Sequence, residues 1–288
     1  MTTNKKDASD PKPLEDISYR GLFDLSGKVA IVTGGAGILG QYFCAGLAES
    51  GANVAVVDLM GVKAQKFSQL LAEQYKIKSI GIACDVSDPL SVQRMVEETV
   101  TEFGEINILH NNAAGKSDDL DAFFAPFEEY SLDQWRKIMN VNIDGMFLVA
   151  QAVGKQMLAQ GRGGSIIQTA SIYGLMGPDH RIYDGSFYLK HQINTPAVYT
   201  ASKAAVIGLT KHLATYWADK GIRVNTLTPG GTESGQNDEF KRRYSDRIPL
   251  GRMALPHEMV CALLYLASDA GSYVTGQNII VDGGLNVW

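Results

Sequence analysis

Short apolar runs alternate along this chain with longer amphipathic stretches, starting at Lys28. The runs are rich in Val and Ile, and their near-continuous hydrophobicity predicts strands covered on both faces, as in a parallel sheet. The predicted strands are 28–33, 52–58, 79–86, 106–113, 165–171, 222–228 and 277–284. Apolar residues at helical spacing predict helices over 37–50, 62–76, 88–104, 131–160, 198–220 and 255–268. This alternation predicts an α/β fold with a doubly wound, Rossmann-type parallel sheet.

The pattern is continuous enough to predict a single domain over 22–288, preceded by a polar, flexible or surface-draped extension over 1–21. Two stretches, 173–197 and 230–248, lack a regular period. Both follow the ends of predicted strands, where ligands bind in doubly wound sheets. We therefore expect these two stretches to be substrate loops.

A glycine-rich turn follows the first predicted strand and contains Gly34, Gly37 and Gly40. Glycines at a strand–helix turn let the backbone approach a pyrophosphate, although an ordinary turn is the alternative. The second predicted strand ends at Asp58, where a carboxylate accepts hydrogen bonds from ribose hydroxyls and repels a 2′-phosphate. The pattern therefore favours NAD(H) over NADP(H), with Asp85 and Val86 beside the adenine; a solvated Asp58 is the alternative.

Tyr199 and Lys203 stand four residues apart in a predicted helix and so lie on one helical face. A cation about 4 Å from a phenol favours the phenolate by roughly 4 kcal/mol at an effective dielectric near 20. We therefore expect this tyrosine to exchange a proton with a substrate hydroxyl near neutral pH. Ser171, at the end of an earlier strand, would supply a hydroxyl to the same oxygen.

Taken together, these motifs resemble the short-chain dehydrogenase/reductase family from Leu25 to Gly284. The resemblance rests on the glycine turn, Asn111-Asn112-Ala113, Asn142, Ser171, Tyr199-x-x-x-Lys203, Pro229-Gly230 and the segment 275–284. It implies that Tyr199 is the general acid/base, that Lys203 lowers its pKa and binds the nicotinamide ribose, that Ser171 polarises the carbonyl, and that Asn142 holds a relay water. The implied cofactor-binding residues also include Ile38, Leu39, Asn112, Ala113, Pro229, Gly230, Thr232 and Ser234.

The chain departs from the family pattern at Ile38, where a glycine is usual, and at Ala114. Ser171 and Tyr199 are also unusually far apart in sequence. The extra residues form the stretch 173–197, and this length is similar to that of the branch acting on sugars, polyols or sugar acids. The family further implies a homotetramer.

The inserted stretch carries cations among aromatic residues. Because it begins after Ser171 and ends before Tyr199, part of it must lie beside the substrate. We expect an anionic or polyhydroxylated substrate, with Arg181 as its first contact, His180 second, and Tyr173 also in the site. The alternative is a surface loop whose charges are solvated.

The charge balance and the cysteine content limit the classes of molecule that the protein is expected to bind. Lys and Arg total 26 against 31 Asp and Glu, giving a net charge of −5, which argues against general nucleic-acid binding. The three cysteines and five histidines form no disulfide or metal-binding pattern. Without an apolar stretch of membrane-spanning length or a signal-peptide core, the sequence predicts a cytoplasmic protein with a small-molecule substrate.

Two other functions remain compatible with the fold. One is a nucleotide sensor without turnover, which would need only the cofactor site and not Ser171, Tyr199 and Lys203. The other is a sugar-nucleotide epimerase or dehydratase, which normally has a larger C-terminal domain than the stretch after Pro229. An oxidoreductase is the interpretation that uses all of the motifs.

Overall fold

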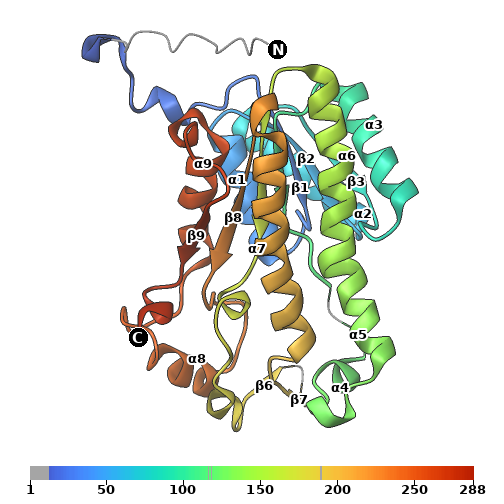
Figure 1. Cartoon of the computed structure of the whole chain (residues 1–288), viewed down its shortest axis with the longest axis vertical. Helices are drawn as coiled ribbons and strands as arrows, with labels where there is room; N and C mark the ends of the chain where they lie inside the picture. The colour runs from blue at the N-terminus through green and yellow to red at the C-terminus, as the bar shows by residue number, and fades with distance from the viewer. Residues whose placement is uncertain (1–12, 116, 118, 189) are drawn as a thin grey trace, which may run out of the picture.

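The computed structural model describes residues 13–115, 117, 119–188 and 190–288. Of the predicted N-terminal extension, residues 1–12 lie outside the described residues. The rest contains two short 3₁₀ helices, η1 (Leu14–Asp16) and η2 (Gly21–Phe23). In Figure 1 this segment projects from the end of the molecule opposite α8 and the β6–β7 hairpin.

Seven parallel strands form the central sheet, in the order β3-β2-β1-β4-β5-β8-β9. They are β1 (Val29–Thr33), β2 (Asn53–Asp58), β3 (Ser79–Ala83), β4 (Ile108–Asn111), β5 (Gly164–Thr169), β8 (Ile222–Pro229) and β9 (Asn278–Val281). The strand order runs outward in both directions from β1 and β4, so a crevice opens beyond their carboxyl ends. The predicted doubly wound α/β fold is confirmed.

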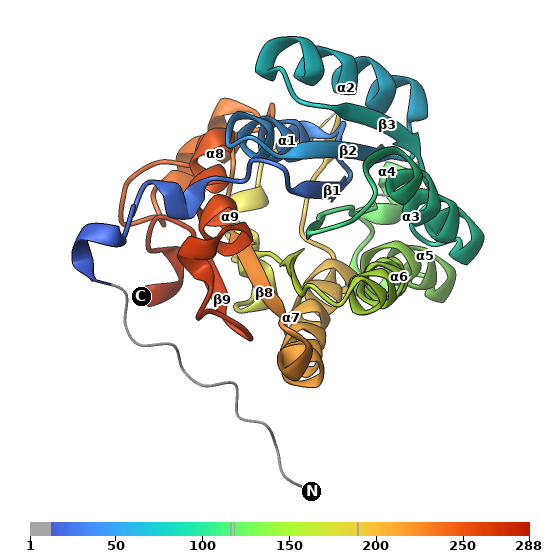
Figure 2. The ribbon, with the colours of Figure 1, turned by 90° about the horizontal axis from the view of Figure 1, so that it is seen from above.

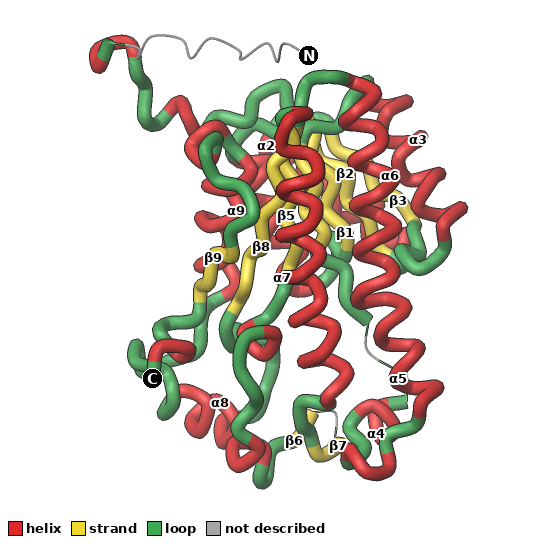
Figure 3. The backbone as a smooth tube through the Cα atoms, in the orientation of Figure 1, coloured by secondary structure: helices red, strands yellow, loops and turns green. Residues whose placement is uncertain are grey.

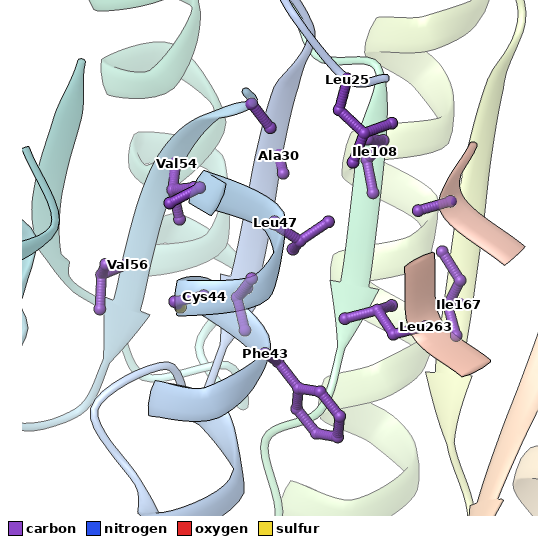
Figure 4. Packing of buried hydrophobic residues seen from close by; sticks show 14 of the residues in the cluster. Leu25, Ala30, Phe43, Cys44, Leu47, Val54, Val56, Ile108, Ile167 and Leu263 are labelled. Carbon is purple, nitrogen blue, oxygen red and sulfur yellow. The ribbon is translucent and has the colours of Figure 1, made fainter. Parts of the chain in front are cut away.

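Helices cover both faces of the sheet, as the view from above shows (Figure 2). They are α1 (Ile38–Glu49), α2 (Gly61–Tyr75), α3 (Pro89–Phe103), α6 (Gly145–Gln160), α7 (Ala197–Trp217) and α9 (Val260–Ala267). Alternate strand residues face opposite layers: Ala30 and Val32 pack with α1 and α9, whereas Ile31 packs with α3, α6 and α7. Figure 4 shows the first of these cores, with Phe43 and Leu47 of α1 against the strands.

The sequence pattern misplaced several element boundaries. The helix predicted over 131–160 is α5 (Leu132–Met139), a π-helical segment η4 (Asn140–Asp144) and α6. The third strand ends at Ala83, so Asp85 and Val86 lie in the turn after it rather than in the strand. Apolar residues continue beyond Ala83 because Cys84 and Val86 pack into the core from that turn.

The two stretches without a regular period contain secondary structure that the sequence analysis missed. Residues 173–197 include η6 (His180–Tyr183) and a hairpin of β6 (Phe187–Tyr188) and β7 (His191–Gln192). Residues 230–248 contain α8 (Asp238–Ser245), and α4 (Leu120–Phe123) follows β4. Figure 3 shows α4, α8 and the hairpin at one end of the molecule. Within the described residues, every helix is too short or too polar to cross a membrane.

Candidate active site

The glycine turn after β1 is a tightly packed strand–helix connection. Gly34 has a positive φ of 64°, and a Cβ there would lie 3.1 Å from the Ala113 Cα. A Cβ at Gly40 would overlap the carbonyl oxygen of Gly34, so this position accepts only glycine without backbone movement. Ile38 begins α1 and is absent from the residues with positive φ, so the departure from the family pattern introduces no backbone strain.

Hydrogen bonds join this turn to the end of β4. The Thr33 hydroxyl accepts the N–H groups of Asn112 and Ala113 at 2.9 and 3.0 Å, and it donates to Asn111 Oδ1 at 3.2 Å. Asn112 Nδ2 donates to the Thr33 carbonyl at 3.1 Å. The two edges of the crevice are therefore held together by side chains of the predicted Asn-Asn-Ala motif.

The Asp58 carboxylate lies beside the same turn. Its Oδ2 accepts the Ala36 N–H at 3.1 Å, and its Oδ1 accepts the Met60 N–H at 3.0 Å. The carboxylate is thus oriented by backbone donors on both sides. Asp85 lies farther along the sheet edge, where its Oδ1 accepts the N–H and hydroxyl of Ser87 at 2.9 and 2.6 Å.

The predicted catalytic residues converge from separate elements. Tyr199 and Lys203 lie in α7, Ser171 follows β5, and Asn142 belongs to η4. The Lys203 ammonium is 5.9 Å from the centre of the Tyr199 ring and donates to the Thr169 carbonyl at 2.9 Å. Burial lowers the pKa of Lys203 to about 8.

The electrostatics of Tyr199 differ from the sequence expectation. Burial raises the pKa of the Tyr199 phenol, and a hydrogen bond with Ser171 only partly opposes this effect. The pKa of Tyr199 stays raised although the Lys203 ammonium lies 5.9 Å from the centre of its ring. The protein alone therefore keeps the phenol protonated, in the state of a hydrogen-bond donor or general acid.

Asn142 has a positioning role that the sequence did not indicate. Its side chain is fully buried, accepts the Gly115 N–H at 2.8 Å and donates to the Ser202 hydroxyl at 3.3 Å. It therefore connects the π-helical segment to the loop after β4 and to the helix that carries Tyr199. A single π-helical turn inside a long helix is often found at a functional site.

Two adjoining cavities meet at Ser171 and Tyr199. One has a volume of about 330 Å³ and is lined by Ile38, Leu39, Asn112, Ala114, Thr169, Ala170, Ser171, Tyr199, Lys203, Pro229, Gly230, Thr232 and Ser234. The second, of about 410 Å³, extends from Tyr199 to α4, α8 and the β6–β7 hairpin. The first contains most of the predicted cofactor residues, whereas Gly34, Gly37, Gly40, Asp58, Asp85, Val86 and Ala113 lie outside its lining.

Of the predicted substrate residues, the structure brings only Tyr173 into the second cavity. The Arg181 side chain is 88% exposed and forms a two-pronged ion pair with Asp179, with both N···O distances 2.8 Å. His180 is also exposed and does not line the cavity. The expectation that Arg181 and His180 contact substrate does not fit this geometry, because η6 turns both side chains toward solvent and Tyr183 inward.

Most residues that line the second cavity are not among those predicted from the sequence. They include Phe123, Phe124, Tyr183, Phe187, Ile193, Asn194, Thr195, Gln236, Phe240, Tyr244 and Met253. The spacing of Phe240 and Tyr244, four residues apart in a polar stretch, is the signal that could have identified α8. Within the described ranges, no group of three or more His, Cys, Asp or Glu residues is placed to hold a metal ion.

Comparisons with known proteins agree with this geometry. Residues 35–286 match the family model described as enoyl-(acyl carrier protein) reductase. The chain is 37% identical to the D-threitol dehydrogenase of Mycolicibacterium smegmatis, over 95% of this chain and 98% of that protein.

Two solved structures are also similar. The gluconate 5-dehydrogenase of Burkholderia cenocepacia, in complex with NADP and tartrate, has a TM-score of 0.81 at 32% identity, covering 93% of this chain and 98% of that one. The short-chain dehydrogenase of Leptospira borgpetersenii with bound NAD⁺ has a TM-score of 0.79 at 29% identity, covering 93% and 96%.

Proposed function

The chain belongs to the short-chain dehydrogenase/reductase family, and we propose that it interconverts a secondary alcohol and a carbonyl on a sugar, polyol or sugar-acid-like substrate. The observation that carries this proposal is the convergence of Ser171, Tyr199 and Lys203 on the 330 Å³ cavity, with Ser171 and Tyr199 also lining the second cavity. A sensor would need only the cofactor site, so the presence of all three residues favours turnover.

The residues present fit a nicotinamide dinucleotide. Four glycines, Gly34, Gly35, Gly37 and Gly40, leave much of the backbone of this turn without side chains, which suits close approach of a pyrophosphate. The 330 Å³ cavity would hold the nicotinamide end between Ile38, Asn112, Pro229 and Thr232. When bound, the cofactor supplies or accepts the hydride.

The protein's own residues handle the proton and the substrate oxygen. The protonated Tyr199 phenol donates its proton to the carbonyl oxygen during reduction and takes it back during oxidation. Ser171, which hydrogen-bonds this phenol, stabilises the same oxygen. Lys203 contributes a nearby ammonium that favours the phenolate formed when the proton leaves.

We further propose a preference for NAD(H). The Asp58 carboxylate is held beside the glycine turn by two backbone donors, where it would accept ribose hydroxyls and repel a 2′-phosphate. Relatives differ in this respect, since the Burkholderia enzyme was solved with NADP and the Leptospira enzyme with NAD⁺. The proposed preference for NAD(H) therefore rests on the Asp58 carboxylate of this chain and not on its relatives.

We also propose an oligomeric state and a cellular location for the protein. Phe147, Leu158 and Tyr216 are exposed along a groove of about 310 Å³ between α6 and α7, and we propose that a second copy covers this face in a homotetramer. Light scattering would test this, and a monomer at micromolar concentration would refute it. The three cysteines are free, which suits a cytoplasmic enzyme.

A turnover assay tests the proposed reaction. The purified protein should oxidise members of a panel of polyols, sugar acids and simple alcohols, followed by nicotinamide absorbance with each cofactor. Tyr199→Phe should lower kcat at least 100-fold and leave cofactor binding intact, because proton transfer by a positioned group contributes roughly 10²–10⁴-fold. Tyr273→Phe, at a fully exposed position, is the matched control. Wild-type activity in Tyr199→Phe would place the proton donor elsewhere.

A further inference from the structure

Three buried tyrosines line the wall of the second cavity beside Ser171 and Tyr199. Tyr173 comes from the 3₁₀ turn after β5, Tyr183 from η6 and Tyr244 from α8, and their exposed fractions are only 7%, 6% and 4%. All three lie in the two stretches without a regular period, 173–197 and 230–248. The fold therefore uses both stretches to bring phenol groups to the reacting end of the cavity.

Hydrogen bonds link two of these phenol hydroxyls and the Thr195 hydroxyl into a short hydroxyl chain. The Tyr183 hydroxyl donates to Tyr173 at 3.3 Å and lies 2.5 Å from the Thr195 hydroxyl. The Tyr244 phenol adds to the same wall of the cavity. A hydroxyl group can both donate and accept a hydrogen bond, so these groups can reorient to bind a substrate hydroxyl, which has the same two capacities.

These groups are neutral. Burial raises the pKa of the Tyr173, Tyr183 and Tyr244 phenols, so they remain protonated at physiological pH. The rest of the wall is largely apolar, with Phe123 and Phe187 among its members. None of the described residues lining this cavity has a charged side chain. A carboxylate bound among these described residues would lose its hydration without gaining a counter-charge from them, which is costly.

We propose that this hydroxyl chain recognises the hydroxyl group next to the reacting carbon, so that the substrate is a neutral vicinal polyol or the matching hydroxyketone rather than a sugar acid. The inference rests on the proposed alcohol–carbonyl reaction and specifies its substrate class. Tyr173, Tyr183, Tyr244 and Thr195 then determine specificity, whereas Ser171 and Tyr199 act on the reacting oxygen itself.

A set of four-carbon substrates separates these roles in the wild-type protein. Threitol and 2,3-butanediol carry vicinal hydroxyls, threonate adds a carboxylate, and 2-butanol has a single hydroxyl. We expect kcat/KM for threitol and for 2,3-butanediol to exceed that for 2-butanol by at least tenfold, and kcat/KM for threitol to exceed that for threonate by the same factor. Equal or better use of threonate would overturn the neutral-substrate inference while leaving the proposed reaction in place. No oxidation of any substrate in this set or in the wider panel would instead refute the proposed reaction.

Variants test whether the hydroxyl groups of this wall distinguish polyols from simple alcohols. Tyr183→Phe and Thr195→Val should each lower kcat/KM for threitol at least tenfold and change that for 2-butanol less than twofold. Thr195→Ser keeps the hydroxyl and should retain most threitol activity, and Tyr273→Phe is the control for tyrosine substitution at an exposed site. An equal fall in kcat/KM for threitol and 2-butanol would mean that these hydroxyl-bearing side chains only pack the wall. If Tyr183→Phe does not fold, the comparison of Thr195→Val with Thr195→Ser tests the same prediction.

Discussion

Lys203 is expected to reduce the stability of the protein at neutral pH. The residue is 2% exposed, and its burial in the folded protein lowers the pKa of the ammonium from an ordinary value of 10.5 to about 8. This difference corresponds to about 3 kcal/mol that favours unfolding when the group must be charged. The penalty is complete below pH 8, where lysine is protonated in both states, and it disappears as pH rises toward 10.5.

Lys203→Met removes this penalty but leaves the Thr169 carbonyl without its side-chain donor, which costs about 1–3 kcal/mol. The two effects nearly cancel at pH 7, so the informative quantity is their pH dependence. Between pH 7 and pH 10 the wild type should gain about 2–3 kcal/mol of unfolding free energy relative to Lys203→Met. Catalytic activity should be lost in the variant at every pH.

Urea unfolding followed by tryptophan fluorescence at pH 7, 8, 9 and 10, without cofactor, measures this difference. Groups that titrate identically in both proteins cancel in the comparison. Lys211→Met lies in the same helix at an exposed position and should show no such trend. A Lys203→Met difference that stays constant from pH 7 to pH 10 would refute the reasoning, because it would mean that burial does not disfavour the charged lysine.

Three further predictions concern separate parts of the site. Asp58→Ala should lower the ratio of kcat/KM for NAD to that for NADP at least tenfold, and a wild type that prefers NADP would contradict the role given to this carboxylate. Gly40→Ala should destabilise the protein by roughly 2 kcal/mol or more in thermal unfolding, because its Cβ would overlap the Gly34 carbonyl, whereas Gly208→Ala, with open space around it, should be neutral or slightly stabilising. Arg181→Ala should leave KM within twofold of wild type because its guanidinium pairs with Asp179 outside the cavity; a tenfold rise in KM would restore it as a substrate contact.

The sequence by itself determined the layered core and the reacting groups. Val- and Ile-rich runs predict strands buried on both faces, and Ile31 and Val32 do face opposite helical layers. The Gly34–Gly40 turn and the Tyr199–Lys203 pair are local patterns, readable because one strand–helix turn or one helical turn contains each of them. The predicted position of Ser171 beside Tyr199 also agrees with the structure, since both line the junction of the two cavities.

Only the tertiary structure shows which residues line the second cavity and how burial changes the pKa of Tyr199. The sequence predicts Arg181 as a substrate contact because it shows the charge of a side chain but not where that side chain points. In the structure, Asp179 holds the Arg181 guanidinium in solvent. Tyr183 and Tyr244 lie 61 positions apart, so no local period could pair them. The pKa of Tyr199 rises rather than falls because the phenol is buried by residues from several elements, which the sequence does not place together.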